Sequence, residues 1–329
     1  MLDRLTNLII PRININSEKS IEEAVLLVKE YGFDSFILFA GNEIKFGEGS
    51  RFKLDDFYNI RKILNQELTK EVLFFIDAEN GFGRRCLEGN KFDLSGVEFL
   101  DYKNQIDIFD SINLELYKNK ISFNLAPVVD ISNEESEVLK GRTFSSNPSK
   151  VSNIARIFLD SALKNKIIGC LKHFPGHGVV KGDTHNEIIK SSISPTELKK
   201  IHIKPFIDLL NQTEMIMINH INYTNYDNDL VPASMSYEIM TNLLLNEIHY
   251  KGIIISDSIR MGSITSNFKE LEMIRAFIIN GGDLILDPFN PIACLNELKK
   301  IYLEIPKEIE RKTTKVLDLK EKARNQLIK

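Results

Sequence analysis

Short apolar runs alternate along the chain with longer segments in which apolar residues recur every three or four positions. The short runs are rich in β-branched and aromatic residues, which is typical of strands buried on both faces of a parallel sheet. Eight such runs predict eight strands, at Leu8–Ile13, Ser35–Phe39, Val72–Ile76, Ile121–Leu125, Ile167–Leu171, Met215–Ile218, Ile253–Ile255 and Asp283–Leu286.

The longer segments have the 3.6-residue periodicity of amphipathic helices. The first, Ile21–Val28, follows Ser17 or Ser20 as its N-cap and ends at Tyr31–Gly32, where glycine is a usual stop signal. The charged tail Lys307–Lys329 also has a helical composition, and we expect it to pack outside the sheet with a solvated face. Further helices are predicted at Leu54–Leu68, Pro148–Leu163, Pro195–Leu210, Tyr237–Ile248, Leu271–Ile279 and Ile292–Leu303.

Strands separated by helices imply parallel βα units, and eight units are the number that closes a barrel. An open, doubly wound sheet would place a glycine-rich phosphate turn after its first strand, but Pro11–Ser17 contains no glycine. No internal repeat or low-complexity linker divides the chain. We therefore predict an α/β fold, a (β/α)8 barrel of the TIM type in a single domain.

Composition narrows the class of protein further. The 329 residues include 42 Lys and Arg against 46 Asp and Glu, a formal charge of −4, whereas a nucleic-acid interface would need a basic stripe. The three cysteines lack CxxC spacing, so neither a disulfide framework nor a zinc ribbon is indicated. No uncharged apolar stretch reaches the ~18 residues of a membrane span, and the apolar run near Met1 is too short for a signal peptide. We expect a cytoplasmic monomer that acts on a small molecule without a cofactor, nucleic acid or membrane.

Polar residues directly follow four of the predicted strands, where a barrel carries its catalytic groups. These residues are Asp77, Lys172–His173, Asn219–His220 and Ser256–Asp257. Each is a charged or hydrogen-bonding group at the end of a run that otherwise belongs in the core. Their common position predicts an active site at the carboxyl ends of the strands.

The densest group of candidate residues is the segment Lys172–His185, in which one proline and three glycines exclude a regular helix. Asp183 and His185 are two residues apart, so in an extended segment their side chains point the same way. A carboxylate beside the imidazole would orient the ring and raise its pKa towards the working pH, which suits a general acid/base. Two alternatives remain open: a metal site formed by loop histidines, and a structural role, which is favoured for His177.

Asp257 follows a buried strand of three isoleucines and lies between Ser256 and Ser258. A carboxylate in this position is well placed to act as a nucleophile on a rigid element. The alternative is a helix N-cap, because Asp and Ser are favoured there. Local sequence does not separate the two.

Several of these motifs resemble a known family. Lys172–Gly178, followed by Asp183-Thr184-His185, is similar to the signature of bacterial β-N-acetylglucosaminidases of glycoside hydrolase family 3. The resemblance covers roughly Asn7 to Leu303. Other landmarks of the family match in the same order, at Ala126–Asp130, Gly141–Phe144, Pro232–Ser234 and Gly252–Asp257.

The resemblance implies a (β/α)8 barrel and a retaining hydrolase of β-linked N-acetylglucosamine. By position, Asp257 would be the nucleophile, and Asp183 with His185 would be the acid/base dyad on a mobile loop. Single-domain cytoplasmic members of the group resemble enzymes of peptidoglycan recycling, which remove N-acetylglucosamine from 1,6-anhydro-muropeptides. Sugar hydroxyls would be bound by Asp77, Arg142, Lys172 and His173.

The chain departs from the family pattern at two places. After Asp77 the family usually has Gln or His and then Glu-Gly-Gly-Arg, whereas here Ala78–Arg84 intervenes. After Asp257 the family often has Asp-Leu-x-Met, whereas Ser258–Met261 places Arg260 near the site. The alternatives to the hexosaminidase are a β-glucosidase or β-xylosidase, an N-acetylglucosaminide phosphorylase, a metal-dependent hydrolase and a non-catalytic sugar-binding barrel.

Overall fold

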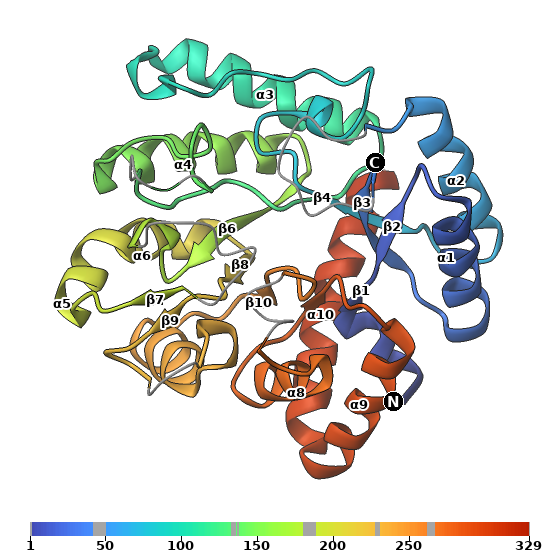
Figure 1. Ribbon diagram of the computed structural model, residues 1–329. Helices are drawn as coiled ribbons and strands as arrows, with labels where there is room; N and C mark the ends of the chain where they lie inside the picture. The colour runs from blue at the N-terminus through green and yellow to red at the C-terminus, as the bar shows by residue number, and fades with distance from the viewer. Residues whose placement is uncertain are drawn as a thin grey trace.

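Seven parallel strands form the central sheet of the computed structural model, which describes residues 2–41, 51–132, 136, 138–179, 189–227, 231–261 and 267–328 (Figure 1). The strands are neighbours in chain order, and every pair is parallel. They are β2 (Arg12–Asn14), β3 (Ser35–Phe39), β4 (Leu73–Ile76), β5 (Phe123–Asn124), β6 (Ile168–Phe174), β8 (Met215–Ile218) and β10 (Ile253–Ser256).

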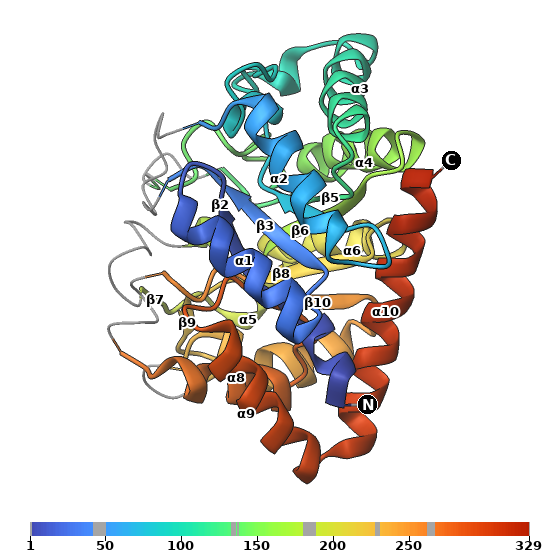
Figure 2. The same ribbon diagram turned by 90° about the vertical axis from the view of Figure 1, so that its right-hand side faces the viewer.

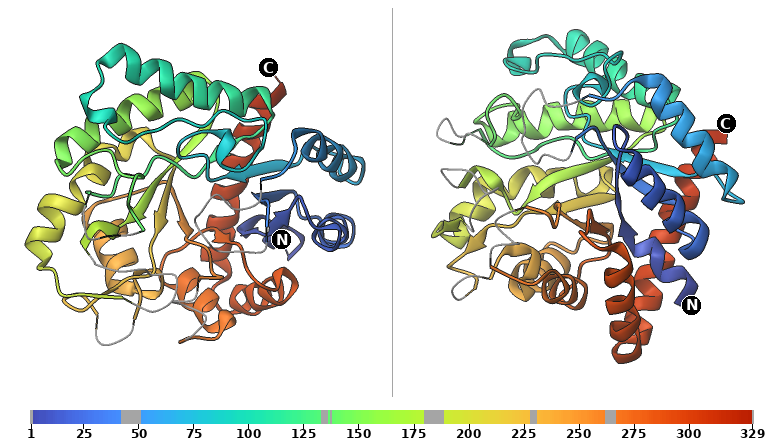
Figure 3. Two further views of the ribbon diagram at one scale, coloured as in Figure 1. Left: turned by 45° about the horizontal axis from the view of Figure 1, so that its top comes forward. Right: turned by 45° about the vertical axis from the view of Figure 1, so that its right-hand side comes forward.

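The remaining predicted strand lies between the two edges of this sheet. β11 (Ile285–Leu286) pairs with β1 (Ile9–Ile10), which Pro11 separates from β2. On its other side, Leu284 bridges Ile255 of the last strand, and the Ser256 amide donates to the Leu284 carbonyl at 3.0 Å. All eight predicted strands are thus confirmed as parts of a curled, parallel, TIM-like arrangement with helices outside it (Figure 3). A closed eight-stranded cylinder stays a prediction.

The main helices begin and end at the signals that the sequence carries. In α1 (Glu18–Tyr31) the Ser17 side chain accepts from the Ser20 amide, and Gly32 ends the helix with a φ of 73°, a conformation that favours glycine. Asn147 caps α4 (Pro148–Lys164), with proline in the first turn. The other confirmed helices are α2 (Leu54–Gln66), α8 (Glu270–Ile279), α9 (Pro291–Glu304) and α10 (Pro306–Ile328).

Four features differ from the sequence-based expectation. The sequence did not predict α3 (Tyr102–Lys118), whose buried stripe includes two amide side chains, Gln105 and Asn113. The predicted helix Pro195–Leu210 is broken into α5 (Pro195–Glu197), a π-type turn at Leu198–His202 and α6 (Lys204–Asp208), because Pro205 has no amide for a continuous helix. The segment predicted as helix Tyr237–Ile248 is a π-type helix at Glu238–Glu247. An additional small sheet, also not predicted, pairs β7 (Lys190–Ser191) with β9 (Asn222–Tyr223).

The C-terminal helix α10 lies at the opposite side of the molecule from β7 and β9 (Figure 2). It contacts acidic residues that stand just before strands. Asp34, which precedes β3 and is 2% exposed, lies 2.9 Å from Lys320 Nζ and 2.6 Å from Arg324 Nη2. Asp283, which precedes β11, lies 2.8 Å from Lys315 Nζ. The helix therefore binds the amino ends of the strands through ion pairs.

The prediction of a helical tail is confirmed, but the expected solvated charge is only part of the picture. Lys312, Lys320 and Arg324 are buried against the strand ends. Burial alone would raise the pKa of Asp34, but Lys320, Arg324 and Lys70 outweigh it and hold this pKa well below its ordinary value. The buried face of α10 is therefore held by paired charges. Within the described residues, no helix is both long and apolar enough to cross a membrane.

Asp34→Asn is expected to lower the free energy of unfolding by about 3–5 kcal/mol, because it leaves buried cations without their carboxylate. Urea denaturation at neutral pH measures the change. The matched control is Glu214→Gln, which breaks another ion pair of α10, the one between Glu214 and Lys322. The Glu214 side chain is 41% exposed and that of Lys322 is 45% exposed. This control is expected to cost less than about 1 kcal/mol. Equal losses of unfolding free energy in the two variants would show that burial of the Asp34 cluster does not increase its contribution to stability.

Candidate active site

A buried lysine joins the carboxyl ends of β4 and β6. Lys172 is 2% exposed, and its Nζ lies 2.7 Å from Asp77 Oδ1 and 2.7 Å from Glu79 Oε1. Burial alone would lower the pKa of Lys172, but Asp77 and Glu79 reverse this and raise it above its ordinary value. The ammonium group is therefore fixed in its charged form between two carboxylates.

Glu79 binds further cations. Arg142 donates to it through Nε at 2.9 Å and Nη2 at 2.7 Å, a bidentate geometry, and Arg84 Nη1 donates at 2.9 Å. Burial opposes ionisation of Glu79, yet Arg142, Arg84 and Lys172 hold its pKa well below the ordinary value. Sequence reasoning missed Glu79. The signal was its two-residue spacing from Asp77, because side chains two residues apart in an extended segment point the same way. The same argument was applied to Asp183 and His185.

His173 is held by a second buried carboxylate. Its Nδ1 lies 2.7 Å from Asp130 Oδ2, and its Nε2 lies 3.5 Å from Arg142 Nη2. With Nδ1 donating to Asp130, Nε2 is the acceptor that faces the arginine. Asp130 also accepts from the backbone amide of His177 at 2.5 Å, which fixes the start of the following loop. The four residues that the resemblance assigns to sugar binding thus lie in one connected cluster, and what they bind stays a prediction.

Asp257 follows β10 and is partly exposed. Its Oδ1 accepts from the next amide, Ser258 N, at 2.7 Å. An N-cap accepts from amides two or three residues ahead, and no helix begins between Asp257 and Met261, so the structure does not support the N-cap alternative. The Asp257 amide donates to the Ile218 carbonyl at the end of β8 at 3.1 Å, and β8 pairs with β6, so Asp257 lies at the same edge of the sheet as Lys172.

His220 fixes the segment that carries Asp257. Its Nδ1 lies 2.7 Å from Ser234 Oγ, and its Nε2 lies 3.2 Å from the Ser258 carbonyl oxygen. Burial lowers the pKa of His220, so the ring is neutral and donates from Nε2 to that carbonyl. The imidazole therefore holds the backbone next to Asp257 in place.

Arg260, which the sequence placed near the site, pairs with the buried Asp287 at the end of β11. Arg260 Nε lies 2.9 Å from Asp287 Oδ1, Arg12 Nε lies 3.0 Å from the same oxygen, and Ser258 Oγ donates to Oδ2 at 2.7 Å. The guanidinium of Arg12 also lies 3.7 Å from the centre of the Phe39 ring. This second charged cluster connects the Asp257 segment with β2 and β3.

The predicted dyad, Asp183 and His185, lies outside the described residues. Over the part of the chain that the structure does describe, no group of three or more His, Cys, Asp or Glu side chains is arranged to hold a metal ion. The ring of His177 is buried 5.7 Å from that of His173, centre to centre. Its backbone contact with Asp130 is consistent with the structural role that the sequence favoured for His177.

Comparison with known proteins gives a family. The family model described as "Glycosyl hydrolase family 3 N terminal domain" matches residues 2–319 of this chain. Beta-hexosaminidase A of Pseudoalteromonas piscicida is 28% identical over 284 residues, which are 80% of this chain and 47% of that protein. The Beta-hexosaminidase of Psychromonas ingrahamii is 32% identical over 241 residues, 70% of this chain and 71% of that protein.

A solved structure shows the same fold. The glycoside hydrolase family 3 beta-N-acetylglucosaminidase from Paenibacillus sp. str. FPU-7 superposes with a TM-score of 0.85 at 21% identity. The match covers 98% of this chain and 62% of that one. The chain thus spans about half the length of the Pseudoalteromonas protein and less than two thirds of the Paenibacillus structure.

The stability of the site is expected to depend on His177. Burial lowers its pKa to about 4, so below pH 6.5 the unfolded chain binds a proton that the folded chain does not. Stability from this residue is therefore present above pH 6.5 and lost as pH falls towards 4. Between pH 7 and pH 5 the loss is about 2 kcal/mol. Urea denaturation of wild type and His177→Gln at both pH values isolates it. Identical pH slopes for the two proteins would contradict the assignment.

Proposed function

Because the chain belongs to glycosyl hydrolase family 3, we propose that it is a retaining β-N-acetylhexosaminidase that releases terminal β-linked N-acetylglucosamine. One observation carries the proposal. Asp257 follows β10, and its amide donates to the Ile218 carbonyl at the end of β8, the strand that pairs with β6, where Lys172 is held in an ion-pair cluster with Asp77 and Glu79. A nucleophile next to polar groups of fixed charge is what a sugar-cleaving site needs.

In the proposed reaction Asp257 attacks the anomeric carbon, and the glycosidic C–O bond breaks. His185, protonated and oriented by Asp183, gives its proton to the leaving oxygen. The neutral imidazole then takes a proton from water, which attacks the glycosyl-enzyme and releases the sugar. Retaining glycosidases usually employ a second carboxylate for these proton transfers, so here an imidazole takes that role.

The described cluster would supply the contacts to the sugar. Lys172 and Arg142 are donors only, and their carboxylate partners keep them charged at neutral pH. Asp77 and the Nε2 atom of His173 are acceptors for hydroxyl protons. Donors and acceptors that are held in place by buried ion pairs lose little entropy when a ligand binds. We therefore assign substrate positioning to these four residues.

Four further parts of the proposal come from the sequence and from the resemblance of its motifs. They are a closed eight-stranded barrel in a single domain, a monomeric state, a cytoplasmic location, and peptidoglycan fragments that end in N-acetylglucosamine linked to 1,6-anhydro-N-acetylmuramic acid. The curled sheet supports the barrel, and the hexosaminidase relatives support a substrate that ends in an N-acetylhexosamine. The reaction needs no cofactor.

The substrate class is tested by comparing nitrophenol release from the β-N-acetylglucosaminide and from the β-glucoside. We expect kcat/KM to be higher for the β-N-acetylglucosaminide, by on the order of 100-fold or more. A site that hydrogen-bonds the acetamido group keeps unpaired polar atoms when glucose binds instead, which weakens binding of the glucoside. Equal rates, or faster cleavage of the glucoside, would contradict the proposal. Assay of free sugar against sugar 1-phosphate in phosphate buffer separates hydrolysis from phosphorolysis.

Asp257→Ala is expected to lower kcat on the nitrophenyl substrate by a factor on the order of 10⁴ or more, because it removes the carboxylate on which the glycosyl-enzyme is proposed to form. Steady-state kinetics measures the loss, and urea denaturation checks that the variant is folded. Asp107→Ala, which removes an exposed carboxylate of α3, is the matched control and should retain full activity. A loss of less than tenfold in Asp257→Ala would exclude the nucleophile role.

His185→Ala is expected to slow substrates with poor leaving groups far more than activated aryl glycosides. A nitrophenolate leaves without protonation, whereas a sugar alkoxide needs the proton of a general acid. Kinetics on the nitrophenyl glycoside and on a disaccharide gives the two losses. Equal losses on both substrates would argue against the acid role.

A further inference from the structure

Of the four polar strand ends that the sequence marks, Asn219–His220 is the one without a role in the proposed reaction. Both residues follow β8 directly, and both are buried. The His220 ring lies between two oxygens, the Ser234 hydroxyl at 2.7 Å from Nδ1 and the Ser258 carbonyl at 3.2 Å from Nε2. Ser258 is the residue after Asp257, so the ring contacts the segment that carries the proposed nucleophile.

The two contacts fix the tautomer of the His220 ring. A carbonyl oxygen only accepts hydrogen bonds, so Nε2 carries the proton that is donated to Ser258. Burial lowers the pKa of His220 and keeps the ring neutral at pH 7, so Nδ1 is an acceptor for the Ser234 hydroxyl. Donation therefore runs from Ser234 to His220 and from His220 to Ser258.

Ser234 is itself held by the backbone on either side of His220. Its amide donates to the Asn219 carbonyl at 3.1 Å, and the Ala233 amide donates to the Ile221 carbonyl at 2.8 Å. Ser234 is completely buried in the turn Ala233–Met235. The hydroxyl is therefore fixed against Nδ1 of the ring.

All three polar groups of Ser258 are hydrogen-bonded. Its amide donates to Asp257 Oδ1 at 2.7 Å, its hydroxyl donates to the buried Asp287 at 2.7 Å, and its carbonyl accepts from His220. The Met261 amide donates to the same carbonyl at 3.2 Å. The amide that binds the Asp257 carboxylate thus belongs to a residue whose other polar groups are held in place.

One short segment, 218–220, holds the backbone on both sides of the Asp257 side chain. Before the side chain, the Asp257 amide donates to the carbonyl of Ile218, the last residue of β8. After it, His220 donates to the Ser258 carbonyl. The direction of the carboxylate therefore depends on the end of β8.

We propose that His220, oriented by Ser234, is a positioning residue that holds the Asp257 carboxylate in the direction of attack on the sugar. In this role it acts through the Ser258 peptide and not on the sugar. The inference rests on the proposed function, because it requires Asp257 to be the nucleophile. The ion pairs of Lys172 with Asp77 and Glu79 do not involve His220, so its loss should slow the attack much more than it weakens binding.

The test is the rate at which a 5-fluoro glycoside of N-acetylglucosamine inactivates the enzyme, together with kcat and KM on the nitrophenyl substrate. His220→Leu removes the ring donor and should lower kcat and the limiting inactivation rate by roughly 10- to 100-fold, as a misplaced reacting group does. KM and the half-saturating inactivator concentration should stay within about threefold of wild type.

Two further variants test the hydrogen bonds themselves. His220→Gln, whose amide N–H can replace that of Nε2, should recover most of both rates. Ser234→Ala removes the donor to Nδ1 and should lower the same rates by on the order of 10-fold. Combined with His220→Leu it should cause no additional loss, because both substitutions act through one contact.

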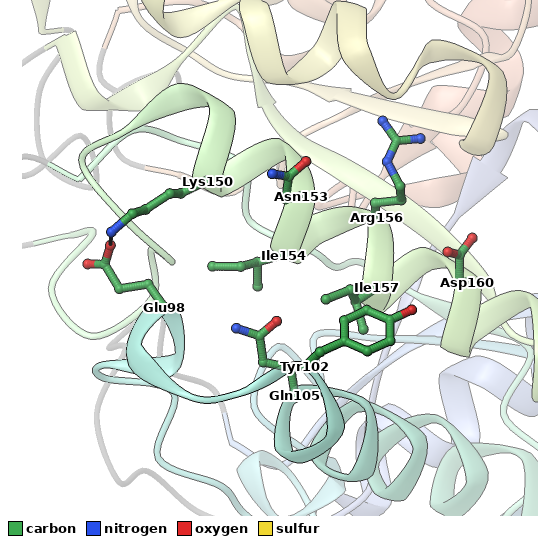
Figure 4. Close-up of a pocket in the computed structure, with 9 residues that line it drawn as sticks. All are labelled: Glu98, Tyr102, Gln105, Lys150, Asn153, Ile154, Arg156, Ile157 and Asp160. Atoms are coloured by element: carbon green, nitrogen blue, oxygen red, sulfur yellow. Dashed lines mark hydrogen bonds and ion pairs between the residues drawn. The ribbon is translucent and has the colours of Figure 1, made fainter.

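Two controls separate positioning from a general loss of structure. Thr213→Val removes a buried hydrogen bond, 2.7 Å from Thr213 Oγ1 to the Met215 carbonyl, at the amino end of β8. Tyr102→Ala truncates an exposed ring in a pocket of about 440 Å³ that is lined by α3, α4 and Glu98 (Figure 4). Both variants should keep the wild-type rates, and urea denaturation measures the stability of each protein.

The outcomes separate this inference from the proposed function. Unchanged rates in His220→Leu, equal losses in His220→Leu and His220→Gln, or an equal loss in Thr213→Val would overturn the positioning role. If His220→Leu does not fold, Ser234→Ala decides, and unchanged rates in that variant overturn the role. A wild-type enzyme that the 5-fluoro glycoside does not label at Asp257 would instead count against the proposed function.

Discussion

The burial of one ammonium group constrains the whole carboxyl edge of the sheet. Lys172 on β6 is shielded from water, so its charge is tolerable only beside Asp77 and Glu79, which follow β4. Two carboxylates beside one lysine need further cations. Arg142 and Arg84 pair with Glu79, and Arg85 lies 3.6 Å from Asp77. The result is a rigid set of donors and acceptors that segments far apart in the chain form together.

The two ends of the strands are stabilised by the same kind of interaction for different purposes. At the amino ends, α10 contributes cations to Asp34 and Asp283, whose carboxylates are 2% and 1% exposed. At the carboxyl ends, Asp77 and Asp257 retain partial exposure. This division matches the general separation in barrels between a stabilising face and a catalytic face. The charged helix α10 is thus part of the scaffold on which the site is built.

The sequence alone predicts the features that depend on interactions between residues close together in the chain. Strands buried on both faces read as apolar runs, so all eight were found, and Ser17 and Gly32 marked the ends of α1 because caps act within a few residues. α3 was missed because its buried stripe includes the amides Gln105 and Asn113, which find partners in Val97 and Ser161 only in the folded chain. The buried charges of Lys320 and Arg324 could not be foreseen, because their partner Asp34 is almost 300 residues away. The spacing of Glu79 from Asp77 was a signal in the sequence, but its pairing with Arg142, 63 residues away, could not be foreseen.

The central claim is that Asp257 forms the covalent bond to the sugar. It is tested most directly by trapping the glycosyl-enzyme with a 5-fluoro glycoside of N-acetylglucosamine and locating the label by mass spectrometry of the digested protein. We expect a single labelled peptide, with the sugar esterified to Asp257, and loss of the label after treatment that cleaves esters. A label on another carboxylate, with Asp257 unmodified, would contradict it.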